Sequence, residues 1–339
     1  MSRAVDPSGG GGDSAVLEPL RMARYRFVAT ILEDMVLPPY KGSAFRGGFG
    51  GAFRRICCTC GEAACKGCAV METCPYAYVF ETRVPADSDR LRNIEDIPRP
   101  FIMEPPEDLT TLLKAGSLMQ FNVVLAGRGI DFLPYFILAF KELGDTGLGR
   151  AAGCMGRRAR FRLEAVDLLG FPPGAPAKPV YDGETGTVRP QATVTADDLA
   201  RYARTLGGRD TLLVRFATPT RLKFNHQYVV NPDFHVLVRA LLRRLSSLLY
   251  FHHGADMAVD YKATIAAAEE VRVTGARVKW IDWTRYSSRQ EERMALGGIT
   301  GEAEYQGDLE PFLPLLVAGT FSHVGKNVTF GLGRYDLII

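Results

Sequence analysis

Residues 310–339, EPFLPLLVAGTFSHVGKNVTFGLGRYDLII, contain an apolar run, a glycine-rich stretch and a short apolar ending. The run at 310–321 predicts a buried helix, and the ending favours a short strand. Glycines between two such elements are typical of backbone that approaches another group closely. The stretch therefore predicts a helix, a glycine-rich loop over 319–334 and a final strand.

The same order occurs once more, in the first half of the chain. Residues 132–143 predict a helix, the tetrapeptide GLGR follows at 147–150 as it does at 331–334, and 159–169 alternate as in a strand. Each half also begins with a predicted strand, a helix and two further strands. The first strands are expected at 22–34 and 211–223, the first helices at 45–55 and 235–250, and the middle strands at 76–84, 117–127, 277–287 and 299–309. Both halves thus have the β-α-β-β-α-β order, so we predict an α+β protein with two tandem ferredoxin-like (RRM-like) domains.

Length and composition agree with two domains. A chain of 339 residues with 47% hydrophobic residues can form two packed cores. We expect a disordered tail at 1–20, an N-terminal domain at 21–170, a linker at 171–210 with one short helix, and a C-terminal domain at 211–339. No run approaches the ~18 apolar residues that span a bilayer, and 1–15 lack the apolar region of a signal peptide. The sequence predicts a soluble, cytoplasmic protein without a membrane partner.

Six of the seven cysteines lie between 57 and 74, in CCTCGEAACKGCAVMETC. Disulfide frameworks are typical of small secreted chains, whereas clustered thiols in a reducing compartment indicate a metal. Four thiolates can form a tetrahedral structural zinc site, and we expect its ligands to be Cys58, Cys65, Cys68 and Cys74. An iron–sulfur cluster that uses Cys57 or Cys60, or thiols without a metal, are the alternatives. A closed zinc site would stabilise the loop without taking part in catalysis.

The C-terminal glycine loop does not match the common nucleotide-binding motifs. A P-loop needs G-x-x-x-x-G-K-[ST] before a helix, whereas here five residues separate the two glycines, asparagine follows the lysine and a strand follows the loop. The dinucleotide motif also fails, because GLGRYD lacks the third glycine. What remains is a loop with His323, Lys326 and Arg334, whose amide groups and cations suit phosphates. Ferredoxin-like sheets commonly bind single-stranded RNA, and the net charge of +3 neither requires nor excludes it.

The segment GDLEPFLPLLVAGTFSHVGKNVTFGLGRY resembles the C-terminal signature of the CRISPR-associated endoribonucleases that process repeat RNA, members of the RAMP superfamily. The similarity continues in FATPTRLK and RYSSRQEERMALGGITGEAEYQGDL, and in the N-terminal half in LPPYKGSAFRGGFGGAFRRICC and CKGC…CPYAYVFET. It covers most of residues 22–339. The resemblance implies tandem ferredoxin-like domains, binding of CRISPR repeat RNA in the precursor transcript, and metal-independent cleavage that leaves a 2′,3′-cyclic phosphate and a 5′-hydroxyl.

RNA chemistry agrees with such an activity without a catalytic cofactor, because the 2′-hydroxyl beside the scissile phosphate is a built-in nucleophile. The enzyme then needs a base for the 2′-proton, an acid for the 5′-oxygen and cations for the charge on the phosphorus. Many members of the resembled family place a catalytic histidine in or near the first helix, whereas this chain has no histidine before His226. We expect Lys41 to take its place as acid or electrostatic stabiliser, His323 to shuttle protons, and Tyr40 and Arg46 to lie beside them. The expected RNA contacts are Gly325, Lys326, Gly331, Gly333, Arg334, Arg285 and Arg289.

The missing histidine leaves two alternative functions open. A non-catalytic RAMP subunit would bind RNA inside a CRISPR effector complex, whose subunits are then its expected protein partners. A zinc-stapled protein-interaction module would leave the glycine loop without a function. The repeat-RNA endoribonuclease is the reading that the two domain patterns and the resemblance favour.

Overall fold

The computed structural model describes residues 15–61, 65, 67–82, 97–150, 156–287 and 292–338, and for the strands between 284 and 295 only the backbone. The elements of the first half are β1 (Arg21–Ile31), β2 (Met35–Val36), α2 (Gly42–Cys57), α3 (Pro75–Phe80), β3 (Phe101–Glu104), β4 (Leu112–Leu113), β5 (Leu118–Ala126), η1 (Gly127–Phe132), α4 (Leu133–Thr146), β6 (Phe161–Leu168), β7 (Lys178–Asp182), β8 (Val194–Thr195) and α5 (Ala196–Leu206). Those of the second half are β9 (Thr211–Thr220), β10 (Lys223–Phe224), β11 (Gln227–Tyr228), α6 (Phe234–His253), α7 (Tyr261–Glu269), β12 (Arg272–Ile281), β13 (Thr284–Ser287), β14 (Glu292–Ala295), β15 (Gly298–Gln306), η2 (Glu310–Phe312), α8 (Leu313–Ser322), η3 (Val328–Phe330) and β16 (Tyr335–Ile338).

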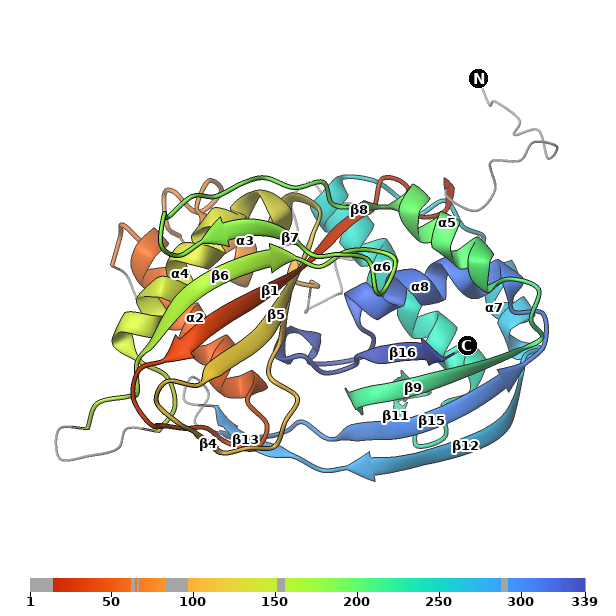
Figure 1. Ribbon diagram of the computed structural model, residues 1–339. Helices are drawn as coiled ribbons and strands as arrows, with labels where there is room; N and C mark the ends of the chain where they lie inside the picture. Colours follow the sequence, from red (N-terminus) through yellow and green to blue (C-terminus); the bar gives the residue numbers. More distant parts are fainter. Residues whose placement is uncertain are drawn as a thin grey trace, which may run out of the picture.

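Two larger antiparallel sheets organise the molecule (Figure 1). The first has the strand order β3-β5-β1-β6-β7, with β8 paired to β1, and the second has the order β12-β15-β9-β16. If the four main strands of each half are counted along the chain, both sheets follow the order 2-3-1-4. The predicted α+β class and the repeated β-α-β-β-α-β order are therefore observed.

The first core forms because one face of β1 and β5 is aromatic and packs on α2 and α4. The Phe27 ring lies 5.2 Å from the Phe121 ring and 4.9 Å from Phe140 of α4. Phe49 of α2 stacks on Phe136 of α4 at 4.8 Å. Helix α2 forms despite its glycines, since tertiary burial overrides weak propensity, and a Cβ at Gly48 would come within 2.9 Å of a Leu143 methyl group. Gly48 thus allows α2 to approach α4 closely.

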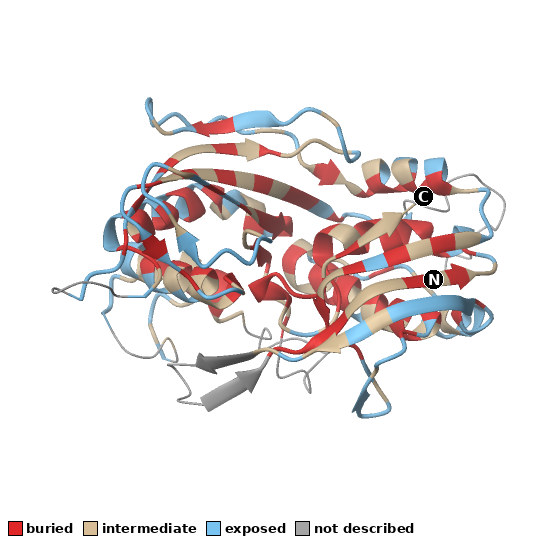
Figure 2. Ribbon diagram, turned by 60° about the horizontal axis from the view of Figure 1, so that its bottom comes forward, coloured by how far each residue is buried: buried red, intermediate tan, exposed pale blue. Residues whose placement is uncertain are grey.

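The second core joins the two halves. Its members come mainly from α5, α6, α8 and the second sheet, but Met22, Ile102 and Val124 of the first sheet belong to it too. Leu17 and Leu20 are also buried there, so the last residues of the expected tail 1–20 pack against the protein; residues 1–14 lie outside the described part. Figure 2 shows how buried residues concentrate where helices meet sheets and where the halves meet.

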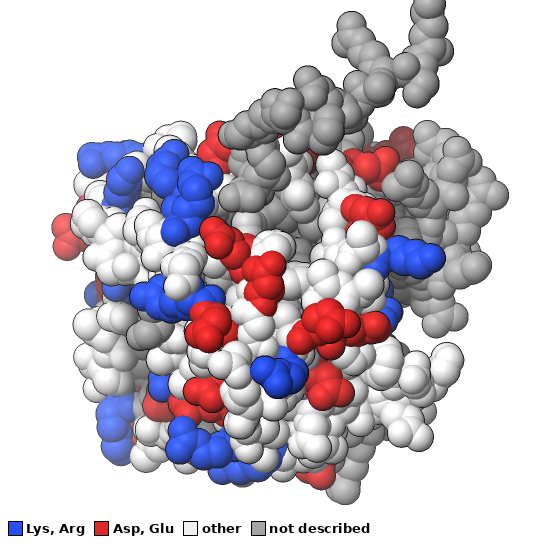
Figure 3. All heavy atoms as spheres, turned by 90° about the vertical axis from the view of Figure 1, so that its right-hand side faces the viewer, with Lys and Arg blue, Asp and Glu red and all other residues white. Residues whose placement is uncertain are grey.

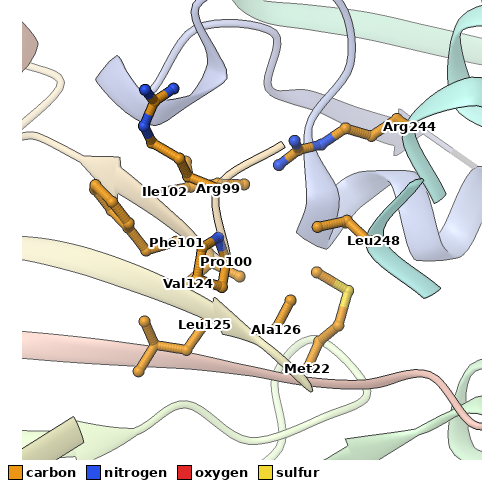
Figure 4. Close-up of a pocket in the computed structure, with 10 residues that line it drawn as sticks. All are labelled: Met22, Arg99, Pro100, Phe101, Ile102, Val124, Leu125, Ala126, Arg244 and Leu248. Carbon is orange, nitrogen blue, oxygen red and sulfur yellow. The ribbon is translucent and has the colours of Figure 1, made fainter. Parts of the chain in front are cut away.

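A small gap in this interface is lined from both halves. In Figure 4, Arg244 and Leu248 of α6 face Met22 of β1 and Ala126 of β5. Arg244 Nε donates a hydrogen bond to the Ser322 carbonyl at 3.1 Å, and burial lowers the pKa of Arg244 to about 10. Nearby, the buried His252 ring contacts the first half through both nitrogens, at 2.9 Å from the Tyr78 hydroxyl and 2.6 Å from the Pro98 carbonyl.

Two sequence-based expectations about these elements differ from the structure. Residues 76–84 were expected as a strand, but 75–80 form α3, which begins with a proline in its first turn and stacks Tyr76 on Phe80 at 5.0 Å. The second strand of the first sheet is instead β3. The segment 171–210 contains the expected helix, α5, but β7 also extends the first sheet and α5 packs on α8. This segment is structured because it contributes apolar side chains to both cores. Val180 belongs to the first core and Leu199 to the second.

Within the described residues, none of the helices combines the length and the apolar character that crossing a membrane requires.

Candidate active site

The N-terminal end of α2 lies against the C-terminal glycine loop. The Tyr40 hydroxyl donates a hydrogen bond to the Phe330 carbonyl, and a Cβ at Gly42 would collide with that same oxygen. The Arg46 guanidinium lies 5.5 Å from the centre of the Phe330 ring. Burial raises the pKa of Tyr40, so this residue acts as a neutral hydroxyl donor. The structure thus brings together the strand–helix junction and the glycine loop, which lie almost 300 residues apart in the chain.

A short acidic segment, Glu104-Pro105-Pro106-Glu107-Asp108, completes this site. It continues from β3, and each of its three carboxylates contacts a cationic side chain that the sequence singled out. Glu104 contacts His323, Glu107 contacts Arg334, and Asp108 contacts Lys41. We refer to residues 104–108 as the acidic segment. Sequence reasoning missed it, although three acids and two prolines directly after a strand were a visible signal.

Lys41 precedes α2 and is completely buried. Its Nζ donates to the Asp108 carbonyl oxygen and lies 3.3 Å from Asp108 Oδ1, while the Asp108 side chain is half exposed. Partial burial would raise the pKa of Asp108, but the Thr110 amide and Lys41 outweigh it and lower that pKa. The first turn of α2 contains no acidic residue. The positive end of the helix dipole and the Lys41 residue therefore lie at the same end of α2, and both favour a negatively charged group there.

His323 lies at the end of α8, fully buried between the two halves. Its Nδ1 lies 3.0 Å from the Leu332 carbonyl and its Nε2 lies 2.9 Å from Glu104 Oε1. Because both neighbours are acceptors, both hydrogen bonds form only when both ring nitrogens carry a proton. Burial lowers the pKa of His323, and the Glu104 carboxylate opposes that shift. The ring presents neither nitrogen to solvent, so its position does not support the expected proton shuttle and indicates a brace between the halves.

Glu104 is the centre of this brace. Besides His323, it accepts hydrogen bonds from Asn122 at 3.0 Å and forms an ion pair with Arg24 at 3.1 Å. Burial alone would raise the pKa of Glu104, but Arg24 first and then His323 outweigh burial and hold it well below its usual range. The carboxylate is thus charged and has donors from both halves. It fixes the start of the acidic segment and the end of α8 relative to each other.

The glycines of the loop explain the close contact. Gly331 has φ +85°, and a Cβ there would lie 2.5 Å from the Met103 carbonyl oxygen; Gly333 has φ +76° and abuts the Val324 carbonyl. Both are buried, so the structure gives them a packing role and does not place them for the expected RNA contacts. Gly325, with φ +90°, is half-buried beside the Arg221 carbonyl. What the glycine loop approaches is therefore the first half of the protein itself.

The cations expected to contact RNA have different positions. Lys326 is exposed at the tip of the loop, and its amide donates to the Arg221 carbonyl at 3.2 Å. Arg334 is mostly buried and contacts Glu107, which raises the pKa of Arg334 against the opposing effect of burial. Arg285 belongs to β13, of which only the backbone is described, and Arg289 lies outside the described residues. Among the expected RNA contacts whose burial is described, Lys326 is thus the one that is exposed to solvent.

The cysteines gather at the opposite end of α2, which as a 16-residue helix is about 24 Å long. Cys60 and Cys68 have their sulfur atoms 3.5 Å apart. Backbone amides of Cys60 and Gly61, with Arg54, lower the pKa of Cys58 and favour its thiolate, the ligand form. Burial raises the pKa of Cys57 to about 12, which disfavours it as a ligand.

The expected ligand set Cys58, Cys65, Cys68 and Cys74 is not assembled. Among the residues that the structure describes, no three side chains of the His, Cys, Asp and Glu types gather as metal ligands do, and residues 62–64 and 66 of the loop lie outside them. The zinc site stays a prediction. The distance along α2 separates the thiols from the site at its other end.

Charge on the remaining surface is mixed in the view of Figure 3, the right-hand end of Figure 1. On that face acidic and basic side chains of the described residues alternate without forming one continuous basic surface. Charges are also paired on the second sheet, where Arg215 lies 3.0 Å from Glu302.

Two family models match most of this chain. Residues 20–193 match the AF_1859 N-terminal domain model, and residues 214–335 match a model described as CRISPR-associated endoribonuclease Cas6. An uncharacterized protein of Archaeoglobus fulgidus is 24% identical over 308 residues, which cover 89% of this chain and 92% of that protein.

Solved structures share the fold. The Thermus thermophilus Cas6 structure superposes with a TM-score of 0.53 at 16% identity, covering 94% of this chain and 99% of that one. A Cas6 product complex gives 0.54 with the same identity and coverage. A partial Cas6-RT-Cas1–Cas2 complex gives 0.55 at 14% identity, covering 95% of this chain but 47% of that longer chain.

Proposed function

The chain belongs to the CRISPR-associated endoribonuclease family Cas6, with an N-terminal half of the AF_1859 type, and on that premise we propose that it cleaves CRISPR repeat RNA at the junction of α2 with the glycine loop. One observation carries the proposal. Lys41 at the start of α2 and Arg334 at the end of the glycine loop are both held by the same five-residue acidic segment. Two cations from distant parts of the chain are therefore held by neighbouring carboxylates, and we infer that one phosphate contacts both.

In the proposed reaction the RNA 2′-hydroxyl gives its proton to a solvent hydroxide or water and attacks the adjacent phosphorus, and the bond from phosphorus to the 5′-oxygen breaks. The products are a 2′,3′-cyclic phosphate and a 5′-hydroxyl, and the nucleophile belongs to the substrate. Arg334 binds the scissile phosphate, and Lys41 stabilises the charge that develops on it and gives a proton to the leaving 5′-oxygen. Tyr40 positions the glycine loop through its bond to Phe330. Lys326, exposed at the loop tip, binds the backbone outside the cleavage position.

The test uses end-labelled repeat RNA with excess EDTA, and a second RNA that carries a 2′-deoxy substitution at the mapped position. We expect cleavage at one position in EDTA, and none of the deoxy RNA. The Lys41→Met variant, which keeps the volume and removes the charge, should slow single-turnover cleavage by about 100-fold or more. The matched control is Lys178→Ala, an exposed lysine on β7. Wild-type cleavage by folded Lys41→Met protein would remove Lys41 from the mechanism.

A second candidate function is a non-catalytic RNA-binding subunit. It is favoured by the absence of any histidine before His226 and by the complete burial of His323. Tight binding of repeat RNA without cleavage, under conditions in which the RNA and the protein stay intact, would establish this function. Subunits of a CRISPR effector complex are its proposed partners, and co-purification with them would follow.

A further inference from the structure

The acidic segment has a feature that a mere brace does not need. Glu104 is buried, but the side chains of Glu107 and Asp108 are 63% and 52% exposed, while their partners Arg334 and Lys41 are 17% and 0% exposed. The two carboxylates therefore lie on the solvent side of the two cations. Anything that approaches these cations from solution meets the carboxylates first.

A carboxylate on a lysine or an arginine makes the same kind of charge-assisted hydrogen bond as a phosphate oxygen. Glu107 and Asp108 thus occupy positions that phosphate oxygens would need. Because Lys41 is buried and Arg334 is mostly buried, each needs an anionic partner, and a phosphodiester that also makes further contacts can take the place of the carboxylates. A single stray anion gains less, because it must break the same pairs without those contacts.

The backbone around these carboxylates is anchored at both ends but irregular between them. Glu104 is fixed by His323, Arg24 and Asn122. At the other end, the Thr111 carbonyl accepts a hydrogen bond from the Leu37 amide at 2.8 Å, just before β4 pairs with β2. Residues 105–111 belong to no helix or strand. The part that carries Glu107 and Asp108 can therefore move without disturbing the anchors.

We propose that Glu107 and Asp108 are specificity-determining residues that occupy the phosphate site in the free protein and are displaced by the RNA backbone. This inference rests on the proposed function, because it assigns Lys41 and Arg334 to the scissile phosphate. The two carboxylates compete with every anion, and only RNA that also contacts the rest of the surface replaces them. They therefore weaken binding of unrelated RNA more than binding of the repeat.

The experiment compares the full-length wild type with the double variant Glu107→Gln/Asp108→Asn. Affinities for repeat RNA and for an unrelated single-stranded RNA of equal length are measured by anisotropy over a salt series. We expect the double variant to bind the unrelated RNA roughly fivefold to tenfold more tightly, with a smaller gain for the repeat. The control is Glu33→Gln/Glu142→Gln, which removes the same charge and releases Arg160 and Arg55 from exposed pairs of 2.9 and 2.8 Å.

Unchanged or weaker binding by the folded double variant, or a gain no larger than that of the control, would overturn the proposal. If the double variant does not fold because buried Lys41 loses its partner, Glu107→Gln alone is used. It releases only Arg334 and should give a smaller gain in the same direction. Failure of this inference can be told apart from failure of the proposed function. A wild type that neither binds nor cleaves repeat RNA refutes the function. A wild type that cleaves, with variants that gain no affinity for RNA, refutes only the role of the two carboxylates.

Discussion

The two GLGR tetrapeptides have similar backbones in different surroundings. Gly147 and Gly149 have φ of +85° and +89°, and Gly331 and Gly333 have +85° and +76°. In each, added Cβ atoms would press on backbone carbonyls. The first loop packs only on its own half and its Arg150 side chain is exposed.

The second loop packs on the other half and is flanked by the buried His323 and by Arg334. The glycines alone therefore make a tight helix-to-strand connection. In the proposed function, cleavage depends on the charged residues around the second loop and on the half that it meets.

The largest difference between the two loops is expected when Glu104 is removed, because Glu104 contacts His323 beside the second loop. We expect Glu104→Ala to lower the free energy of unfolding by about 3–5 kcal/mol, since it removes an acceptor from the buried His323 and from the half-buried Arg24 and Asn122. Urea denaturation would measure this. The control Glu164→Ala, whose partner Arg162 is exposed, should cost less than about 1 kcal/mol. Equal losses of unfolding free energy in the two variants would show that the contacts of Glu104 stabilise the protein no more than an exposed ion pair does.

Acid should weaken the other contact between the halves, at His252. Burial lowers the pKa of His252 to about 4, from an ordinary value near 6.5. Between these pH values the unfolded chain binds a proton that the folded protein does not, so stability falls as the pH falls from 6.5 to 4, by about 3 kcal/mol from this residue. Denaturation curves over this pH range should lose much of that slope in His252→Gln. The exposed His226→Gln variant should keep it, and an equal loss in both would contradict the assignment.

Alanine at equivalent glycines tests the comparison directly. Gly147→Ala and Gly331→Ala both put a side chain at a φ of +85°, with a Cβ 2.5 Å from a carbonyl oxygen, so each should lower stability by about 1–3 kcal/mol. Only Gly331→Ala should also reduce cleavage of repeat RNA below the loss that unfolding explains. Assays at a temperature where both variants are folded would show this. Gly47→Ala on α2, where an added Cβ meets nothing within 4 Å, is the neutral control; equal loss of cleavage in Gly147→Ala would remove the distinction.

The smallest effect on cleavage is expected at the cysteine end of α2. Cys65→Ser/Cys68→Ser should remove bound zinc and lower thermal stability, yet folded protein should cleave RNA as the wild type does, because the thiols lie a helix length away from Lys41. Metal analysis and melting curves would be measured together. Unchanged metal content and unchanged melting would refute the zinc prediction. A loss of cleavage at full folding would refute the separation of the two sites.

Local patterns in the sequence were sufficient for the order of most elements. The apolar faces of α4, α6 and α8 and the alternation in β1, β5 and β9 gave the repeated β-α-β-β-α-β order, because helix and strand periods depend on near neighbours. The exception at 75–80 has a physical cause. A run of aromatic residues suits either a strand or a short helix, and Pro75 with packing on α2 decided for the helix.

The sequence identified only part of the site. The sequence pointed to Tyr40, Lys41 and Arg46 at the start of α2 and to the glycine loop, and the structure brings these two regions into contact. It could not show that His323 is buried or that the acidic segment holds the cations. Those pairs join residues 67 to 227 positions apart in the chain, and no local period encodes such distances.

The sequence by itself determined the α+β class, the tandem repeat and the family resemblance, since each depends on patterns within short stretches of neighbouring residues. Tertiary structure alone decided which charges meet. A buried lysine or histidine is stable only if a partner reaches it through the fold, so burial and pairing arise together when the two halves pack. The packing of β3 and α2 against the glycine loop thus brings Glu107 and Asp108 onto Arg334 and Lys41.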